Sequence, residues 1–377
     1  MNYLFFILGG KIIGFSKRKI LLYLIYLFIF ITASFIFFNL RHYRRSGGDS
    51  GEMVLLVSHL PSYRYYYRSP GIFFLHQTTY FLFRPYGLTG ENAVAISSSL
   101  AGGIFFCVLI AFSIHPFFLI LNLFSGIVFI FTGHLENYGM MNAILAYCFL
   151  TGKRYLEGKG SFSFAVFIWL LASFMHMLGI FYLPAVLYLF LRPSKIFPLH
   201  SHEVSNADLL VGTEIIESRF KLPSQKQIEI SILIIIIFAI IITFVPLVMK
   251  DRVFMLDVGM LRLVPLFKIT NPRHYFTMFS LEHFKILLYF IRQSSILGIP
   301  LLILLIPQIK SKTHIFILAG FLSGFLWAFI WHPDMGYGDW DLFGSFAIPL
   351  NLLVGLLLSE IFPMPTLEKF HKKFLLS

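Results

Sequence analysis

The first long apolar run of the chain reads ILLYLIYLFIFITASFIFFNL at residues 20–40, and its 21 residues include no charged side chain. A helix needs about 20 such residues to cross the hydrocarbon core of a bilayer. The run is followed by the basic stretch RHYRR at 41–45 and then by the turn SGGDSGE at 46–52. We therefore predict a membrane-spanning helix that leads into a flexible acidic turn.

This acidic turn combines two carboxylates with three glycines. Asp49 and Glu52 are three residues apart, so one helical turn would place both carboxylates on the same side. Gly47, Gly48 and Gly51 leave the backbone free to approach a ligand closely. The turn is either a helix N-terminus, where the helix dipole favours carboxylates, or one wall of a reactive site.

The composition excludes a soluble protein. The 377 residues are 58% hydrophobic and 13% charged, with a mean hydropathy of +0.80, whereas soluble domains carry roughly 25% charged residues. The chain is therefore expected to be a polytopic membrane protein. Cys107 and Cys148 both lie in apolar runs and predict neither a disulfide framework nor a metal site. Residues 1–19 lack a cleavage pattern and are expected to form an interfacial segment.

Ten apolar stretches are candidates for membrane-spanning helices. They are residues 20–40, 93–113, 116–131, 137–152, 161–175, 177–191, 230–249, 286–306, 313–331 and 343–360. Residues 92–133 are uncharged and too long for one helix, so we divide them at His115-Pro116. Residues 161–191 form either one long tilted helix or, as we prefer, two short helices that meet near His176.

The distribution of basic residues predicts that both termini are cytoplasmic. Short loops rich in Lys and Arg favour the cytoplasm. With ten spans and the N-terminus inside, the cytoplasmic segments hold 17 of the 30 basic residues. The short outer loops, 132–136, 176 and 332–342, hold none.

The predicted fold is an all-α transmembrane bundle with two modules. The modules and the cytoplasmic loop that joins them are residues 1–191, 230–377 and 192–229. The outer loop 41–92 is apolar and aromatic but broken by prolines, which fits helices that lie in the interface plane. Such helices form either a lipid-anchoring flap or part of a site for a lipid substrate. The C-terminal module has outer loops at 250–285 and 332–343.

Acidic residues and His176 gather in the predicted outer loops, and ionisable groups that converge at a membrane edge are usually functional. Glu136, in FTGHLENYG (131–139), is either part of a polar interface turn or a substrate contact, and HxE alone is a weak zinc signal. His176 is either a satisfied core histidine or a site residue. The stretch HPDMGYGDWDLF (332–343) is either a solvated loop anchored by Trp340 or a site that holds a cation or sugar hydroxyls.

The candidate ligands follow from these residue types. Arginine binds phosphate oxygens in a bidentate manner, so the basic outer loops are either solvated surfaces or a site for a lipid phosphate. The substrate-binding candidates are Glu52, Glu136, His176, Arg64, Arg68, Arg252, Arg262, Arg273, Asp339 and Asp341. No cofactor is certain, and a divalent cation (Mg²⁺ or Mn²⁺) held by Asp339 and Asp341 is a candidate. The chain contains no nucleotide-binding or nucleic-acid-binding motif, so no nucleic-acid partner is expected.

Four short motifs resemble the GT-C superfamily of integral-membrane glycosyltransferases, and especially its bacterial branch related to protein O-mannosyltransferases. The motifs are GGDSGE (47–52), SPG (69–71), LENYGMMNAIL (135–145) and HMLGIFYLP (176–184). DWDLF (339–343) is also similar to a stretch in bacterial members of the superfamily. The resemblance implies that Asp49 is the catalytic base and that the donor is a polyprenyl-phosphate sugar.

The expected function is sugar transfer at the extracytoplasmic face of a membrane, such as the bacterial inner (plasma) membrane, to a glycan, lipid or protein acceptor. The donor would reach the site sideways through the bilayer. The alternative is a multi-pass transporter or flippase for a lipid-linked or anionic substrate. A transporter should carry charges in mid-span, broken helices and repeated halves. Here the spans are nearly free of charge, and no repeat is detected.

Overall fold

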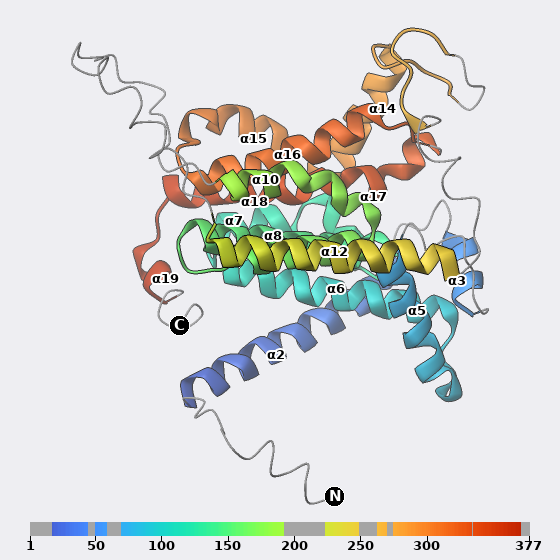
Figure 1. The fold of residues 1–377 in the computed structure, drawn as a ribbon, viewed down its shortest axis with the longest axis horizontal. Helices are drawn as coiled ribbons and strands as arrows, with labels where there is room; N and C mark the ends of the chain where they lie inside the picture. Colours follow the sequence, from blue (N-terminus) through green and yellow to red (C-terminus); the bar gives the residue numbers. More distant parts are fainter. Residues whose placement is uncertain are drawn as a thin grey trace, which may run out of the picture.

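The computed structural model describes residues 17–43, 50–58, 69–191, 223–248, 262–269, 274–333 and 335–370. These residues form helices and connecting turns, and the β-structure among them is a single antiparallel bridge between Leu263 and Trp331. The prediction of an all-α fold is confirmed for the described part of the chain. Figure 1 shows the long helices running side by side along one axis.

Four helices in the described residues are long and apolar enough to cross a membrane. They are Ile20–Tyr43, Gly90–Phe112, Lys312–Ile330 and Gly336–Ile361, and a bent pair of helices would make a fifth span. These helices indicate an integral membrane protein. The other long helices are α8 (Tyr138–Leu156) and α12 (Gln225–Val248). By length and composition the described helices therefore give four or five spans, and the ten predicted spans are not confirmed.

The predicted break at Pro116 is present. Helix α6 (Gly90–Phe112) ends before it, and α7 (Pro116–Leu123) begins with the proline at a position where its missing N–H costs nothing. The predicted span 116–131 is not one helix, because α7 gives way to the 3₁₀ helix η3 (Gly126–Phe131). A Cβ at Gly126 would overlap the carbonyl oxygen of Gln293, so the chain departs from the α-helix where it packs against another backbone.

The chain reverses at His176, as the two-helix interpretation of 161–191 predicts. Helix α9 (Phe162–Met175) is followed by the extended residue His176 and then by η4 (Met177–Tyr182) and α10 (Leu183–Leu191). The indole Nε1 of Trp169 donates to the carbonyl oxygen of Gly179 at 2.9 Å. Because this bond joins residues on both sides of His176, η4 packs back against the end of α9.

The predicted span 286–306 is a bent pair of helices, which is either a broken span or a re-entrant loop. Helices α14 (Leu281–Ser295) and α15 (Gly298–Leu305) meet at an angle of 88°. A Cβ at Gly298 would overlap Ser295 Oγ and lie 2.6 Å from Leu350 Cδ2, so glycine permits both the bend and the close contact with α18 (Ala347–Ile361). The amphipathic sequence of α14, LEHFKILLYFIRQSS, also differs from that of a span surrounded by lipid.

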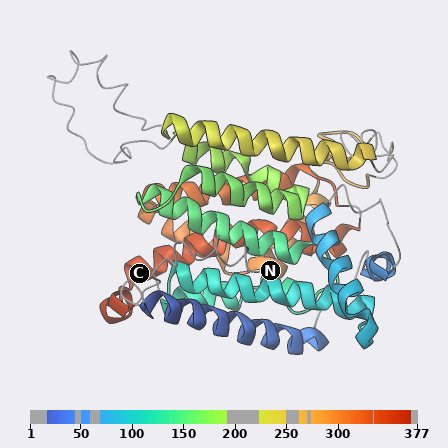
Figure 2. The same ribbon diagram turned by 60° about the horizontal axis from the view of Figure 1, so that its bottom comes forward.

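The described turns sort to two ends of the bundle. Helices α3 (Ser50–Ser58), α5 (Pro70–Phe83) and α17 (Trp340–Phe343) lie at one end, which we call the site end, and α19 (Pro365–Phe370) lies at the other (Figure 1). Figure 2 shows α5 running across the direction of the long helices. At the opposite end, His115 Nε2 donates to the carbonyl oxygen of Phe362 at 2.7 Å. This sorting agrees with the predicted inner and outer turns.

A small apolar cluster fixes α3 and α5 to the start of α6. Its fully buried members include Met53 and Val57 on α3, Phe73 on α5 and Val94 on α6. Leu135, from the loop before α8, joins the same cluster. The cluster therefore holds the loop that contains Glu136 against the first predicted outer loop.

Candidate functional site

Two buried polar contacts join three distant segments at the site end. Ser50 Oγ, at the start of α3, donates to Glu136 Oε1 at 3.1 Å. His134 Nε2 donates to Asp341 Oδ2 on α17 at 2.6 Å. All four residues are buried. The loop before α8 therefore lies between the start of α3 and the loop that contains Asp341.

Local features of the chain set the position of His134. Gly133 has a φ of +69°, in the left-handed region that favours glycine. A Cβ there would lie 2.7 Å from Arg41 Cβ, so glycine also permits contact with the turn that follows α2 (Lys17–Asn39). Ser98 Oγ on α6 donates to the carbonyl oxygen of His134 at 2.6 Å.

The pairing with Asp341 orients the His134 imidazole. A carboxylate only accepts hydrogen bonds, so the proton in this contact is on Nε2. The second carboxylate oxygen, Oδ1, accepts from the backbone N–H of Leu342 at 2.8 Å. In the described part of the chain, His134 Nδ1 has no hydrogen-bond partner. The imidazole is thus held by a carboxylate on one side and has an unused nitrogen on the other, which is an arrangement suited to binding or proton transfer.

Asp339 and Asp341 have different partners. Asp339 is buried, and its Oδ2 accepts from the backbone N–H of Met335 at 2.8 Å. Among the residues that the structure describes, no group of three or more His, Cys, Asp or Glu side chains could hold a metal ion. A divalent cation at Asp339 and Asp341 remains a prediction.

His176 has a structural role at the chain reversal. Its Nδ1 accepts from the backbone N–H of Leu178 at 3.1 Å and so caps η4. Its ring lies edge-on to Tyr138, with 5.1 Å between the ring centroids. These contacts support the interpretation of a satisfied core histidine, located beside the first residue of α8.

Arg262 and His332 hold together the two segments that precede α14 and α17. The backbone N–H of His332 donates to the carbonyl oxygen of Arg262 at 2.6 Å. The His332 ring stacks on Phe276 at 4.5 Å and lies 4.5 Å from the ring of His274. Burial, and to a smaller extent the neighbouring His274 and Arg262, lower the pKa of His332 to about 4. His332 is therefore neutral at pH 7.

Several predicted site residues lie outside the described residues. They are Asp49, Arg64, Arg68, Arg252 and Arg273. The backbone of Glu52 belongs to the first turn of α3, but its side chain also lies outside the described part. The roles predicted for these residues stay predictions. His134 was not among the predicted site residues, and the HxE pattern with Glu136 was the signal that pointed to it.

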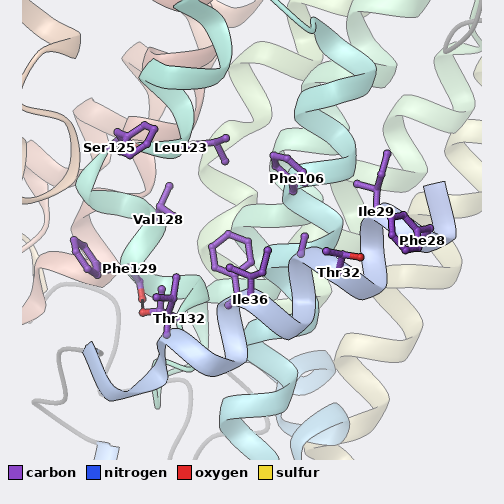
Figure 3. A pocket seen from close by; sticks show the side chains of 14 residues that line it. Phe28, Ile29, Thr32, Ile36, Phe106, Leu123, Ser125, Val128, Phe129 and Thr132 are labelled. Carbon is purple, nitrogen blue, oxygen red and sulfur yellow. Dashed lines mark hydrogen bonds between the residues drawn. The ribbon is translucent and has the colours of Figure 1, made fainter. Parts of the chain in front are cut away.

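An apolar groove of about 540 Å³ lies beside the site end, between α2, α6 and the segment 123–132. On one side its lining extends from Phe28 on α2 to Leu40, the first residue of the 3₁₀ helix η1 (Leu40–Tyr43) that follows α2. Figure 3 shows Thr32 and Ile36 of α2 along one side of the groove and Val128, Phe129 and Thr132 along the other. The lining residues Leu40 and Thr132 immediately precede Arg41 and Gly133, so the groove leads to the loop that carries His134 and Glu136.

Together, the apolar helices, the buried polar contacts and the lateral groove define an all-helical integral membrane protein with a polar site at one end. Comparison of the chain with protein-family models, curated proteins and solved structures gives no match.

Proposed function

We propose that this protein is a membrane glycosyltransferase that moves a sugar from a polyprenyl-phosphate donor to an acceptor at the site end. The observation that carries the proposal is the apolar groove that leads to buried polar residues. A lipid-linked substrate has this combination of properties, with a long apolar chain joined to a polar head. The site end corresponds to the extracytoplasmic face in the topology that the basic residues predict, in a membrane such as the bacterial inner membrane.

The chemistry requires a base and a group that stabilises the departing phosphate. The acceptor oxygen attacks the anomeric carbon while the bond from this carbon to the phosphate oxygen breaks. The acceptor proton passes to the base, for which we propose Asp49, and the electron pair of the broken bond stays on the lipid phosphate. In-line attack inverts the anomeric centre. Arginines of the predicted outer loops, including Arg64 and Arg273, are proposed to bind the phosphate.

His134 and Glu136 are proposed to bind hydroxyl groups of the sugar or the acceptor. Glu136 contacts Ser50 at the start of α3. Ser50 directly follows Asp49 in the sequence. The buried Nδ1 of His134, which has no hydrogen-bond partner among the described residues, is proposed to accept one of these hydrogen bonds. Polar side chains at the end of an apolar groove are the usual means of orienting an amphiphilic ligand.

The test is sugar transfer by the purified protein from a polyprenyl-phosphate sugar, with Asp49→Asn and Glu52→Gln as matched variants. The acceptor is first identified by mass spectrometry of envelope glycans from cells with and without the protein. Loss of a general base lowers the rate by about 10²–10⁴-fold, so Asp49→Asn should reduce transfer by this factor. Glu52→Gln should change the rate little if Glu52 only stabilises the N-terminus of α3. The reverse result would make Glu52 the base.

A transporter or flippase for a lipid-linked substrate is the second candidate, because of the 88° bend between α14 and α15. Discontinuous helices are common where transporters bind their substrates. An assay in detergent solution separates the two functions. A glycosyltransferase still forms product there, whereas a flippase cannot act because detergent provides no second membrane face. Product formation in detergent would exclude transport as the primary activity.

A further inference from the structure

We propose that Arg41 binds the phosphate of a polyprenyl-phosphate lipid whose apolar chain occupies the groove along α2. This inference rests on the proposed function and adds to it the binding site of the donor. Arg41 was not among the arginines that the sequence suggested as phosphate ligands.

Arg41 is a half-buried cation whose described contacts are made with Phe38. Its Nη1 donates to the carbonyl oxygen of Phe38 at 3.0 Å, and the guanidinium lies 4.2 Å from the centroid of the Phe38 ring. In the part of the chain that the structure describes, no carboxylate forms an ion pair with Arg41. A guanidinium has five N–H donors, so most of them are available to an anion.

The position of Arg41 links the groove to the polar site. It follows Leu40, which lines the groove, and its Cβ packs against Gly133, next to the groove residue Thr132. The backbone and Cβ of Arg41 therefore lie where the apolar lining ends and the loop with His134 begins, and its guanidinium packs on Phe38 beside the groove. An apolar channel that ends one residue before an arginine is complementary to an amphiphile with an anionic head.

The occupant we infer is a single-chain lipid phosphate. The groove, at about 540 Å³, is within the usual range of roughly 300–1,000 Å³ for the pocket of one ligand. Apart from Thr32, the lining residues from Phe28 to Leu40 are apolar, which suits one extended chain. A phosphate at Arg41 would direct the attached sugar towards His134 and Glu136.

The head-group contact is tested by binding of two probes to the full-length protein in detergent. The probes are a polyprenyl monophosphate and the uncharged polyprenol of the same length. The wild type should bind the phosphate more tightly. A hydrogen bond to a charged group contributes about 1.5–3 kcal/mol, so Arg41→Gln should reduce this preference by about ten- to a hundredfold. Arg41→Lys should retain part of it.

Arg84→Gln is the matched control for the loss of charge. Arg84 also lies over the ring of a phenylalanine three residues earlier, 5.1 Å from the centroid of Phe81, but it is at the end of α5, which contributes no residue to the groove, whereas Arg41 directly follows the lining residue Leu40. The Arg84→Gln variant should therefore keep the wild-type preference for the phosphate probe. Polyprenol binding that is the same in Arg41→Gln and the wild type would show that the variant is folded.

The chain contact is tested by two adjacent substitutions on α2. Ile36 lines the groove, whereas Phe35 is 67% exposed and does not line it. Ile36→Trp should therefore weaken the binding of both probes, and Phe35→Trp should weaken neither. Equal effects of the two substitutions would show that the lipid chain lies elsewhere.

Other results would overturn the inference in distinguishable ways. If the wild type transfers sugar and prefers the phosphate probe, but Arg41→Gln keeps that preference, Arg41 is not the ligand and the proposed function stands. If the wild type shows neither transfer nor a phosphate preference, both proposals fail. If it prefers the phosphate through Arg41 but transfers no sugar, only the proposed function fails. Displacement of the probe by equimolar phosphatidylglycerol would show a general anionic-lipid site and contradict the single-chain occupant.

Discussion

At the residue level, His134 and Asp341 form a short buried contact between a histidine and a carboxylate at the site end, at 2.6 Å. The structure also contains a second pair of this type at the opposite end, where His314 Nε2 donates to Glu360 Oε1 at 3.0 Å. The two pairs differ in burial, since the Asp341 side chain is 10% exposed and that of Glu360 is 60% exposed. They therefore provide a direct comparison of a buried and an exposed pair.

Asp341→Ala should lower the thermal stability of the protein, because it leaves the buried Nε2–H of His134 without an acceptor. An unpaired buried donor costs about 1–3 kcal/mol. Asp341→Asn should have a smaller effect, since its amide oxygen can still accept the bond. Thermal unfolding in detergent measures both. Glu360→Ala is the control and should cost less, about 0–1 kcal/mol. Equal stability of Asp341→Ala and the wild type would contradict this account.

At the level of elements, α2 is held to the bundle by close packing against α6. Only 11% of the most apolar segment of this helix is buried, so most of its surface would face lipid. Two glycines of α6, Gly102 and Gly103, allow the helices to approach. Small residues serve the same purpose at helix contacts in other membrane proteins. Because α2 is also one wall of the groove, this contact sets the width of the groove.

Gly103→Ala should destabilise the contact between α2 and α6. The added Cβ would overlap Ser34 Oγ and lie 2.8 Å from the carbonyl oxygen of Phe30. Overpacking of this kind typically costs about 1–3 kcal/mol, which should appear as a lower melting temperature and weaker polyprenol binding. Gly139→Ala is the control, since its Cβ would meet its nearest neighbour, Ile130 O, at 3.4 Å. A stable Gly103→Ala variant with unchanged polyprenol affinity would show that α2 can move without cost.

At the level of the whole molecule, the predicted topology places the site end on the extracytoplasmic side of the membrane. Cysteine labelling in intact cells tests it, after Cys107 and Cys148 are replaced by alanine. Tyr86 is 85% exposed near the site end, and Lys310 is exposed at the opposite end. An impermeant maleimide should label Tyr86→Cys in intact cells and Lys310→Cys only after permeabilisation. The opposite pattern would place the site end in the cytoplasm.

The features of the fold that sequence predicts well are those that local chemistry controls. The all-α class follows from apolar runs without charges, and the helix break at Pro116 follows from the missing N–H of proline. The bend at Gly298 and the change of helix type at Gly126 could not be predicted in this way. They depend on the approach of Leu350 and Gln293, which are distant in sequence.

The candidate site also has features that the sequence indicates and features that only tertiary packing determines. The residue types alone indicated that Glu136 and Asp341 belong to polar loops at a membrane edge, because carboxylates are rare in so apolar a chain. Their partners, Ser50 and His134, are separated from them by 86 and 207 residues. Neither hydrogen bond has a local sequence signal, since each forms only when the packing of the helices brings the loops together. The sequence therefore determined the membrane-protein class and several candidate residues, whereas tertiary packing determined which of these residues meet and where the groove reaches them.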